Sequence, residues 1–189
     1  LYFHARSKSK GREQFTYAAL TDNFINYSHL IDKPIAPFYL KVFKHNNQFY
    51  GMSKGGNLWR SEDGLSKFEA GINPFNRKLD NELWHNDSGS IRHVGLNLLK
   101  DELQIYFSVI GDCPERILFS SINFNGKDWR EWKVGEIYEV IRPEYEYEGS
   151  NFLLSPSASG PVDSPQRQLR DPHLIRDNGK LYLIYTVCG

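Results

Sequence analysis

Short runs of alternating hydrophobic and polar residues fill most of the chain, and polar turns separate them. Few stretches show the spacing of hydrophobic positions that marks an amphipathic helix. The turn Asp177-Asn178-Gly179 lies between two apolar runs and is a strong hairpin signal. The pattern therefore predicts an all-β protein. A polar turn followed by an aromatic-rich strand occurs at 45–53, 100–108 and 177–186.

Three kinds of strand recur in the same order, which indicates a repeated structural unit. The anchors of the second strand, Phe49, Ile105 and Tyr182, are 56 and 77 positions apart. The longer interval contains a connection at 141–164, rich in Ser, Pro and Gly in its second half. A meander that recurs every 40 to 50 residues, roughly, is typical of β-propeller blades. An irregular β-sandwich is the alternative, because its hairpins also resemble one another.

We expect a single incomplete propeller domain. A propeller closes only with its full ring, and an open one leaves sheet surfaces uncovered. We therefore expect the chain to be a fragment of a longer protein. The predicted blades are partial at 1–33 and 165–189 and complete at 34–72 and 90–140.

Composition and charge exclude several classes of partner. The 189 residues include 23 basic and 23 acidic side chains. The net charge is therefore zero, and the chain has no excess of positive charge that would attract nucleic acid or an acidic membrane. No apolar run approaches the roughly 20 residues that span a bilayer. Cys113 and Cys188 form no disulfide framework, and the histidines show no metal spacing, so we expect no metal and no cofactor. The sequence leaves the localisation open, although the cysteine usage slightly favours the cytoplasm.

The Arg-Asp-Pro segment at 170–172 is not required for the hairpin that follows it. Its proline suits the first residue of a strand, where a missing N–H costs least. This places Asp171 at the mouth of the funnel that the first strands of a propeller line. The corresponding positions before the other two anchors, shifted by one residue, are Tyr39 and His93. Both His93 and Asp171 follow an arginine, so an arginine next to a charged or polar residue occurs at two strand entries.

Two stretches resemble a known superfamily of enzymes. The sequence "LRDPHLIRDNGKLYLIYT" resembles the Arg-Asp-Pro strand of the five-bladed β-propeller glycosidases, which include arabinanases, levansucrases and invertases. The sequence "GNLWRSEDGLSKFE" resembles one of their outer hairpins, and the ordered set of strands is similar to an incompletely characterised bacterial branch. The resemblance implies a partial five-bladed propeller that cleaves glycosides with three carboxylates from different blades. It also implies that Asp171 orients the sugar or tunes the acid, and that Arg170 pairs with Asp171 or contacts the sugar.

Hydrolysis of a glycosidic bond needs one protonated carboxyl and one carboxylate. In "PEYEYEG" we interpret Glu148, next to Gly149, as the acid, with a solvated acidic edge as the alternative. In "GDCPER", Asp112 and Glu115 are candidate substrate contacts. The alternative there is a turn in which Asp112 bonds its own backbone.

Arg92 and His93 are candidate ligands of sugar hydroxyls, and a half-buried structural histidine is the alternative. Trp84 is a candidate sugar platform. The leading hypothesis is therefore a glycoside hydrolase that acts on an oligosaccharide at the funnel. A non-catalytic carbohydrate-binding propeller and a protein-interaction scaffold are the alternatives, because a fold does not by itself determine a function.

Overall fold

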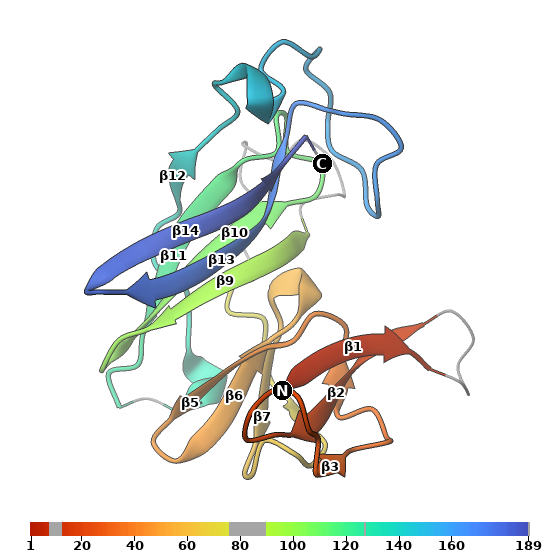
Figure 1. Ribbon diagram of the computed structural model, residues 1–189. Coiled ribbons are helices and arrows are strands. Elements are labelled where there is room, and N and C mark those ends of the chain that lie inside the picture. The colour runs from red at the N-terminus through yellow and green to blue at the C-terminus, as the bar shows by residue number, and fades with distance from the viewer. Residues whose placement is uncertain (8–12, 76–89, 127, 189) are drawn as a thin grey trace. The chain divides into compact units, whose positions relative to one another are not determined.

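The computed structural model of the chain describes residues 1–7, 13–75, 90–126 and 128–188. In these ranges the secondary structure consists of β-strands and three single-turn 3₁₀ helices (Figure 1). The strands within each sheet pair antiparallel. The prediction of an all-β fold is confirmed. No helix in the described ranges is long and apolar enough to cross a membrane.

The chain divides into two compact units, Leu1–Ile72 and Asn73–Gly189. Unit 1 contains two sheets of four strands each. In the first sheet, β2 pairs with β1 on one side and with β3 and β4 on the other, and the second sheet has the order β5-β6-β7-β8. The elements of unit 1 are β1 (Tyr2–Arg6), β2 (Gln14–Leu20), β3 (His29–Leu30), β4 (Ala36–Pro37), β5 (Lys41–His45), β6 (Gln48–Met52), η1 (Lys54–Gly56), β7 (Leu58–Ser61) and β8 (Glu69–Ala70).

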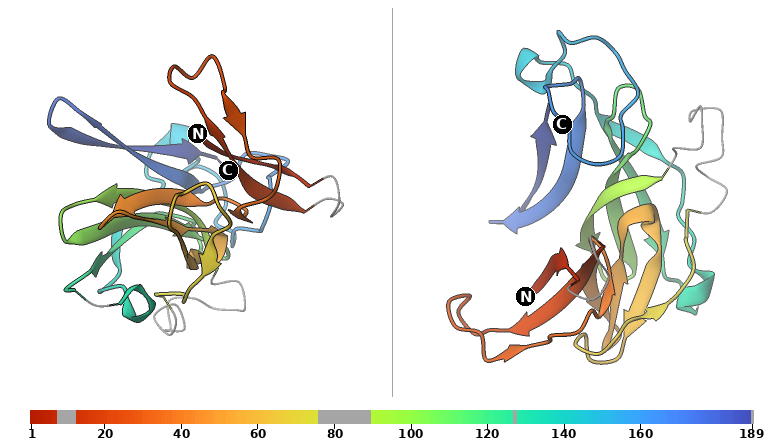
Figure 2. Two further views of the ribbon diagram at one scale, coloured as in Figure 1. Left: turned by 90° about the horizontal axis from the view of Figure 1, so that it is seen from below. Right: turned by 90° about the vertical axis from the view of Figure 1, so that its right-hand side faces the viewer.

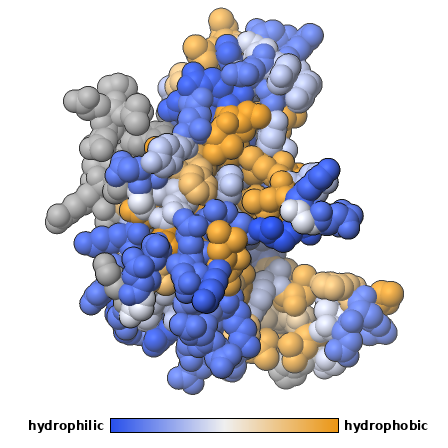
Figure 3. All heavy atoms as spheres, turned by 90° about the vertical axis from the view of Figure 1, so that its left-hand side faces the viewer, coloured by the Kyte–Doolittle hydropathy of each residue, from blue (hydrophilic) through white to orange (hydrophobic). Residues whose placement is uncertain are grey.

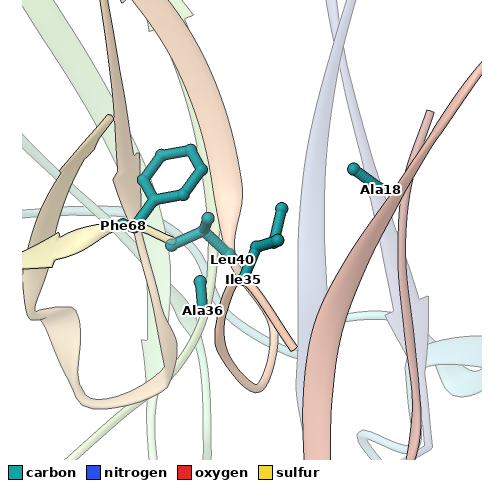
Figure 4. Packing of buried hydrophobic residues seen from close by; sticks show 5 residues of the cluster. All are labelled: Ala18, Ile35, Ala36, Leu40 and Phe68. Carbon is teal, nitrogen blue, oxygen red and sulfur yellow. The ribbon is translucent and has the colours of Figure 1, made fainter. Parts of the chain in front are cut away.

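A small hydrophobic core joins the two sheets of unit 1. It consists of buried side chains from β2, from the β4 region and from the loop before β8 (Figure 4). Leu40 lies against Gly51 so closely that a Cβ at that glycine would be 2.7 Å from the leucine side chain. The small residue therefore lets the chain before β5 pack onto β6. The buried residues of this core are Ala18, Ile35, Ala36, Leu40 and Phe68.

Unit 2 contains a four-stranded sheet and a two-stranded hairpin. The sheet has the order β12-β11-β10-β9, and alternate side chains of β10, from Leu103 to Val109, are fully buried. The hairpin β13-β14 lies over one face of this sheet (Figures 1 and 2). The elements are β9 (Ile91–Leu98), β10 (Glu102–Val109), β11 (Ile117–Asn123), η2 (Trp129–Glu131), β12 (Tyr138–Ile141), η3 (Glu146–Glu148), β13 (Leu169–Asp177) and β14 (Lys180–Val187).

The turns of the hairpins follow from their sequences. Asn178 and Gly179 both have positive φ, at 47° and 76°, and join Asp177 to its register partner Lys180. Two central residues with positive φ define the tight turn that suits the twist of antiparallel strands. The hairpin predicted for this segment is therefore confirmed. Asn46 and Asn47 make the same kind of turn between β5 and β6.

The described strands form separate sheets of two or four strands and do not close into a ring. The meanders β5–β8 and β9–β12 and the hairpin β13-β14 are compatible with blades of an incomplete propeller. Hydrophobic residues reach the surface among hydrophilic ones, as the face in Figure 3 shows. The exposed hydrophobic side chains of the hairpin include Ile175, Tyr182 and Ile184.

Candidate functional site

The candidate site is a contact between Asp171 and His93 in unit 2. The strand β13 contains a bulge, because its register with β14 shifts between Arg170 and His173. Asp171 lies in this bulge with a φ of 52°, in the left-handed region. Its carboxylate contacts Nδ1 of His93 and accepts a hydrogen bond from Oγ1 of Thr186 at 3.3 Å. A bulge re-aims side chains in this way, and bulges are over-represented next to functional sites.

Gly95 allows β13 to approach β9 at this point. A Cβ on Gly95 would lie 2.6 Å from the Leu174 side chain and 2.8 Å from the carbonyl oxygen of Pro172. Any side chain there would push the two strands apart. Gly95 is two residues from His93, so both lie on the same face of β9. The close approach therefore holds His93 beside Asp171.

Access to solvent differs between the two partners. The side chain of Asp171 is 44% exposed, and that of His93 is 15% exposed. The carboxylate can accept hydrogen bonds from a ligand, while the imidazole is largely covered by the fold. This combination is suited to recognition of a polar, hydroxyl-bearing ligand.

The arginines that precede these residues lie in the interior. Arg92 donates from Nε and from a terminal nitrogen to the two oxygens of Glu115, at 2.7 and 2.9 Å. The Arg170 Nε lies 3.3 Å from Glu115 Oε2 and donates to Gln168 Oε1 at 2.7 Å. All three charged side chains are buried. They form an Arg–Glu–Arg cluster whose members are not exposed to bind a substrate.

The cluster holds the long connection against the strands. Arg92 donates to the carbonyl oxygen of Ala158 at 2.6 Å, and Arg170 donates to that of Gly160 at 3.1 Å. Leu169 N donates to the carbonyl oxygen of Glu115 at 2.9 Å, so the backbone of the same segment is also bound. Burial lowers the pKa of Arg170, and the nearby Arg92 charge acts in the same direction. The arrangement is structural: it orders the chain before Asp171.

Asp112 is also buried, beside the Arg–Glu–Arg cluster. Burial raises its pKa to about 6, against the opposing charge of Arg116. Arg116 Nε donates to its Oδ2 at 3.0 Å, and Cys113 N donates to its Oδ1 at 3.0 Å. Arg116 also donates to Glu139 of β12 at 2.5 Å. Asp112 thus anchors a loop and is not presented to solvent.

Glu148 is fully buried at the end of η3. Its carboxylate accepts hydrogen bonds from the backbone of Glu144 and Tyr145, at 2.9 and 3.1 Å, and from Tyr185 Oη at 2.8 Å. Burial raises its pKa, but these three hydrogen bonds together lower it. A general acid needs a raised pKa and contact with the leaving group. The structure instead gives Glu148 the geometry of a carboxylate that fastens the loop to β14.

The structure therefore brings together only part of the predicted set. Asp171 and His93 meet, and Arg92, Arg170 and Glu115 form a separate buried cluster. Tyr39 belongs to unit 1, and Trp84 lies outside the described residues. In the described part of the chain no group of His, Cys, Asp and Glu could hold a metal ion.

Thr186 and Gly95 contribute to the site, and neither was identified from the sequence. A lone glycine within a strand indicates that another backbone segment approaches closely, and Gly95 is such a glycine, two residues after His93. Thr186 carried no comparable signal, because strand threonines are common.

Comparisons with known proteins identify two relatives. The chain is 35% identical over 193 aligned residues to an uncharacterised protein of Acanthamoeba polyphaga mimivirus; the match covers 100% of this chain and 54% of the relative. It is 30% identical over 149 residues to a 5-methyltetrahydropteroyltriglutamate–homocysteine methyltransferase of Buchnera aphidicola subsp. Cinara cedri (strain Cc). That match covers 74% of this chain and 18% of the methyltransferase. No family model matches the chain. The chain thus spans about half the length of the viral relative and less of the bacterial one.

These findings correct the predicted family. The resemblance to the five-bladed propeller glycosidases is wrong as an assignment, because the relative that matches the whole chain is uncharacterised and the other is a methyltransferase. The short Arg-Asp-Pro motif was too unspecific to identify a superfamily.

Proposed function

We propose that unit 2 is a non-catalytic carbohydrate-binding module whose site contains Asp171, His93 and Thr186. The observation that carries the proposal is the exposed carboxylate of Asp171, held in a left-handed bulge against a largely covered imidazole. Residues in sparsely populated conformations persist where the surrounding structure over-determines them, and they cluster at functional sites. A fixed carboxylate acceptor is a suitable partner for sugar hydroxyl groups.

The hairpin also offers an apolar surface beside this polar pair. Thr186, Ile184 and Tyr182 occupy alternate positions of β14 and so share one face. Ile184 and Tyr182 are exposed, at 49% and 46%. An exposed tyrosine ring can stack on the C–H face of a sugar. Tyr182 and Thr186 are four positions apart in β14, which corresponds to roughly 13 Å along the strand. A ligand that touches both residues is therefore an oligosaccharide.

Binding is favoured over hydrolysis by the state of the other carboxylates. Hydrolysis needs a second carboxyl group, roughly 5 to 10 Å from the first, that reaches the same ligand. Glu115 and Glu148 are fully buried. Glu115 accepts hydrogen bonds from Arg92, and Glu148 accepts them from Tyr185 and from two backbone amides. Asp112 is buried against Arg116. Asp171 is thus the one carboxylate of the predicted set that is exposed.

The test is thermal stabilisation of the purified protein by a panel of plant and microbial oligosaccharides. We expect at least one sugar to raise the melting temperature of the wild type. Asp171→Asn should weaken the binding of that sugar at least tenfold. Asparagine tolerates the left-handed conformation, so the variant keeps the fold. Asp177→Asn, in the exposed turn of the same hairpin, is the matched control and should bind normally.

Two outcomes would overturn the proposal. One is an equal response of the wild type and Asp171→Asn to every sugar. The other is release of reducing sugar by the wild type that Asp171→Asn abolishes, because that would identify a hydrolase.

A further inference from the structure

Unit 1 contains a cavity that is separate from the site proposed in unit 2. It has a volume of about 470 Å³ and opens between β1, β2 and the start of β5. This volume is in the range of small-molecule pockets. The residues that matter for its chemistry are Tyr2, Phe3, His4, Thr16, Tyr39 and Lys41.

Tyr39 is held over this cavity in a strained conformation. Its φ is 57°, and a bulky residue in the left-handed region is a genuine outlier. Thr16 closes the turn on both sides of it, since Oγ1 donates to the carbonyl oxygen of Pro37 at 2.5 Å and accepts from Leu40 N at 3.4 Å. Leu40 is itself fixed in the core against Gly51. The fold thus maintains an unfavourable backbone conformation that places one aromatic ring.

The aromatic rings form flat surfaces at the mouth of the cavity. The ring centroids of His4 and Tyr39 are 4.6 Å apart with an angle of 63° between the planes. Phe38 lies 3.8 Å from Tyr39 and 4.9 Å from His4, measured between centroids. The ring of His4 packs edge to face against both of the others, and Phe38 and Tyr39 are tilted against each other, so Phe38 supports the rings of His4 and Tyr39 that line the cavity. They present a rigid surface for a planar ligand.

Lys41 adds a positive charge to the same wall. Its ammonium group has no ion-pair or hydrogen-bond partner in the described part of the chain. Burial lowers the pKa of Lys41. Burial also lowers the pKa of His4, and the charge of Lys41 acts in the same direction. A half-buried cation without a counter-charge is unfavourable, and an anionic ligand would relieve this.

We propose that this cavity binds a small planar molecule that carries a carboxylate, with Lys41 pairing with the carboxylate and the rings of His4 and Tyr39 contacting the planar body. A single ammonium group matches a single carboxylate. Val42 adds an apolar residue to the lining of the cavity. The inference does not depend on the carbohydrate site, because its residues all belong to unit 1.

The experiment compares three probes by titration calorimetry and by shifts of backbone amide NMR signals. Benzoate has both the ring and the charge, benzamide has only the ring, and acetate has only the charge. We expect benzoate to bind at least tenfold more tightly than either of the others. The amide signals of Tyr39 and Lys41 should move on titration.

Lys41→Met should lower the affinity for benzoate at least tenfold and leave the affinity for benzamide unchanged. Lys44→Met is the matched control, because Lys44 is an exposed residue of the same strand that lies over the Phe49 ring, outside the cavity wall. Tyr39→Asn should also lower the affinity for benzoate. This variant should keep the fold, since asparagine adopts the left-handed conformation readily. The melting temperature of each variant checks that it is folded.

The proposal is overturned if benzamide or acetate binds as tightly as benzoate, or if folded Lys41→Met binds benzoate normally. The pH dependence provides a further check. Benzoate affinity should fall as the pH rises toward the pKa of Lys41, below the ordinary value for lysine, because the ammonium loses its charge. An affinity that stays constant through this range would contradict the role of Lys41.

Discussion

Arg92 and Glu115 form a buried bidentate ion pair, although 23 positions separate them in the chain. The planar guanidinium group of Arg92 matches the two oxygens of the carboxylate, and both side chains are almost completely shielded from water. Because Arg170 also approaches Glu115, one carboxylate compensates two buried cations. The stability of the region before Asp171 therefore depends on Glu115.

Replacing Glu115 with glutamine should destabilise the protein by about 3–5 kcal/mol. The substitution leaves two buried arginines without a counter-charge, and breaking a buried pair costs about this much. Denaturant-induced unfolding of wild type and Glu115→Gln measures the loss. Glu69→Gln is the control, since Glu69 pairs with Arg60 near the surface and such pairs contribute about 1 kcal/mol or less. Equal losses in the two variants would show that burial of the cluster is not decisive.

Asp112 should make stability depend on pH between about 4 and 6. Burial raises its pKa to about 6 in the folded state, so the folded protein holds this proton more tightly than the unfolded chain does. The resulting stabilisation is complete at pH values below the ordinary pKa of an aspartate in the unfolded chain. It is lost as the pH rises through about 6, the pKa of Asp112 in the folded protein. Its size is about 2–3 kcal/mol, from a difference of roughly two pKa units.

The measurement is the free energy of unfolding of the wild type and Asp112→Asn at several pH values. The wild type should lose stability relative to the variant as the pH rises from about 4 to 7. Asparagine cannot titrate, so the difference between the two curves isolates this carboxyl group. A constant difference over this range would mean that Asp112 is ionised throughout.

Gly95→Ala should loosen the contact between β13 and β9. The added Cβ would be 2.8 Å from the backbone of Pro172, and the backbone must move to accommodate it. We expect a loss of about 1–3 kcal/mol, typical of overpacking. The His93 imidazole signals in an NMR spectrum should shift as well, because Asp171 adjoins Pro172.

Gly135→Ala is the control for this experiment. A Cβ there would meet only the carbonyl oxygen of Ser121, at an ordinary 3.5 Å. The change should alter stability by less than about 0.5 kcal/mol. A tolerated alanine at both positions would show that the strands have room to separate.

The local elements were predictable because their causes are local. Alternation along β10 and the Asp177-Asn178-Gly179 turn each act within a few residues, and both appear in the structure as predicted. The contact of Asp171 with His93 was not predicted as a pair. It depends on a bulge and on Gly95, and the two residues are 78 positions apart.

The sequence by itself determined the all-β character, the hairpins and the identity of the charged residues. Only the tertiary structure decided which charges are accessible. Glu148 and Asp171 were both candidate carboxylates, yet one is buried under hydrogen bonds from its loop and from β14, and the other is exposed on a bulge. The physical reason is that solvent exposure and hydrogen-bond partners depend on contacts between distant segments, and these differ at positions with the same local pattern.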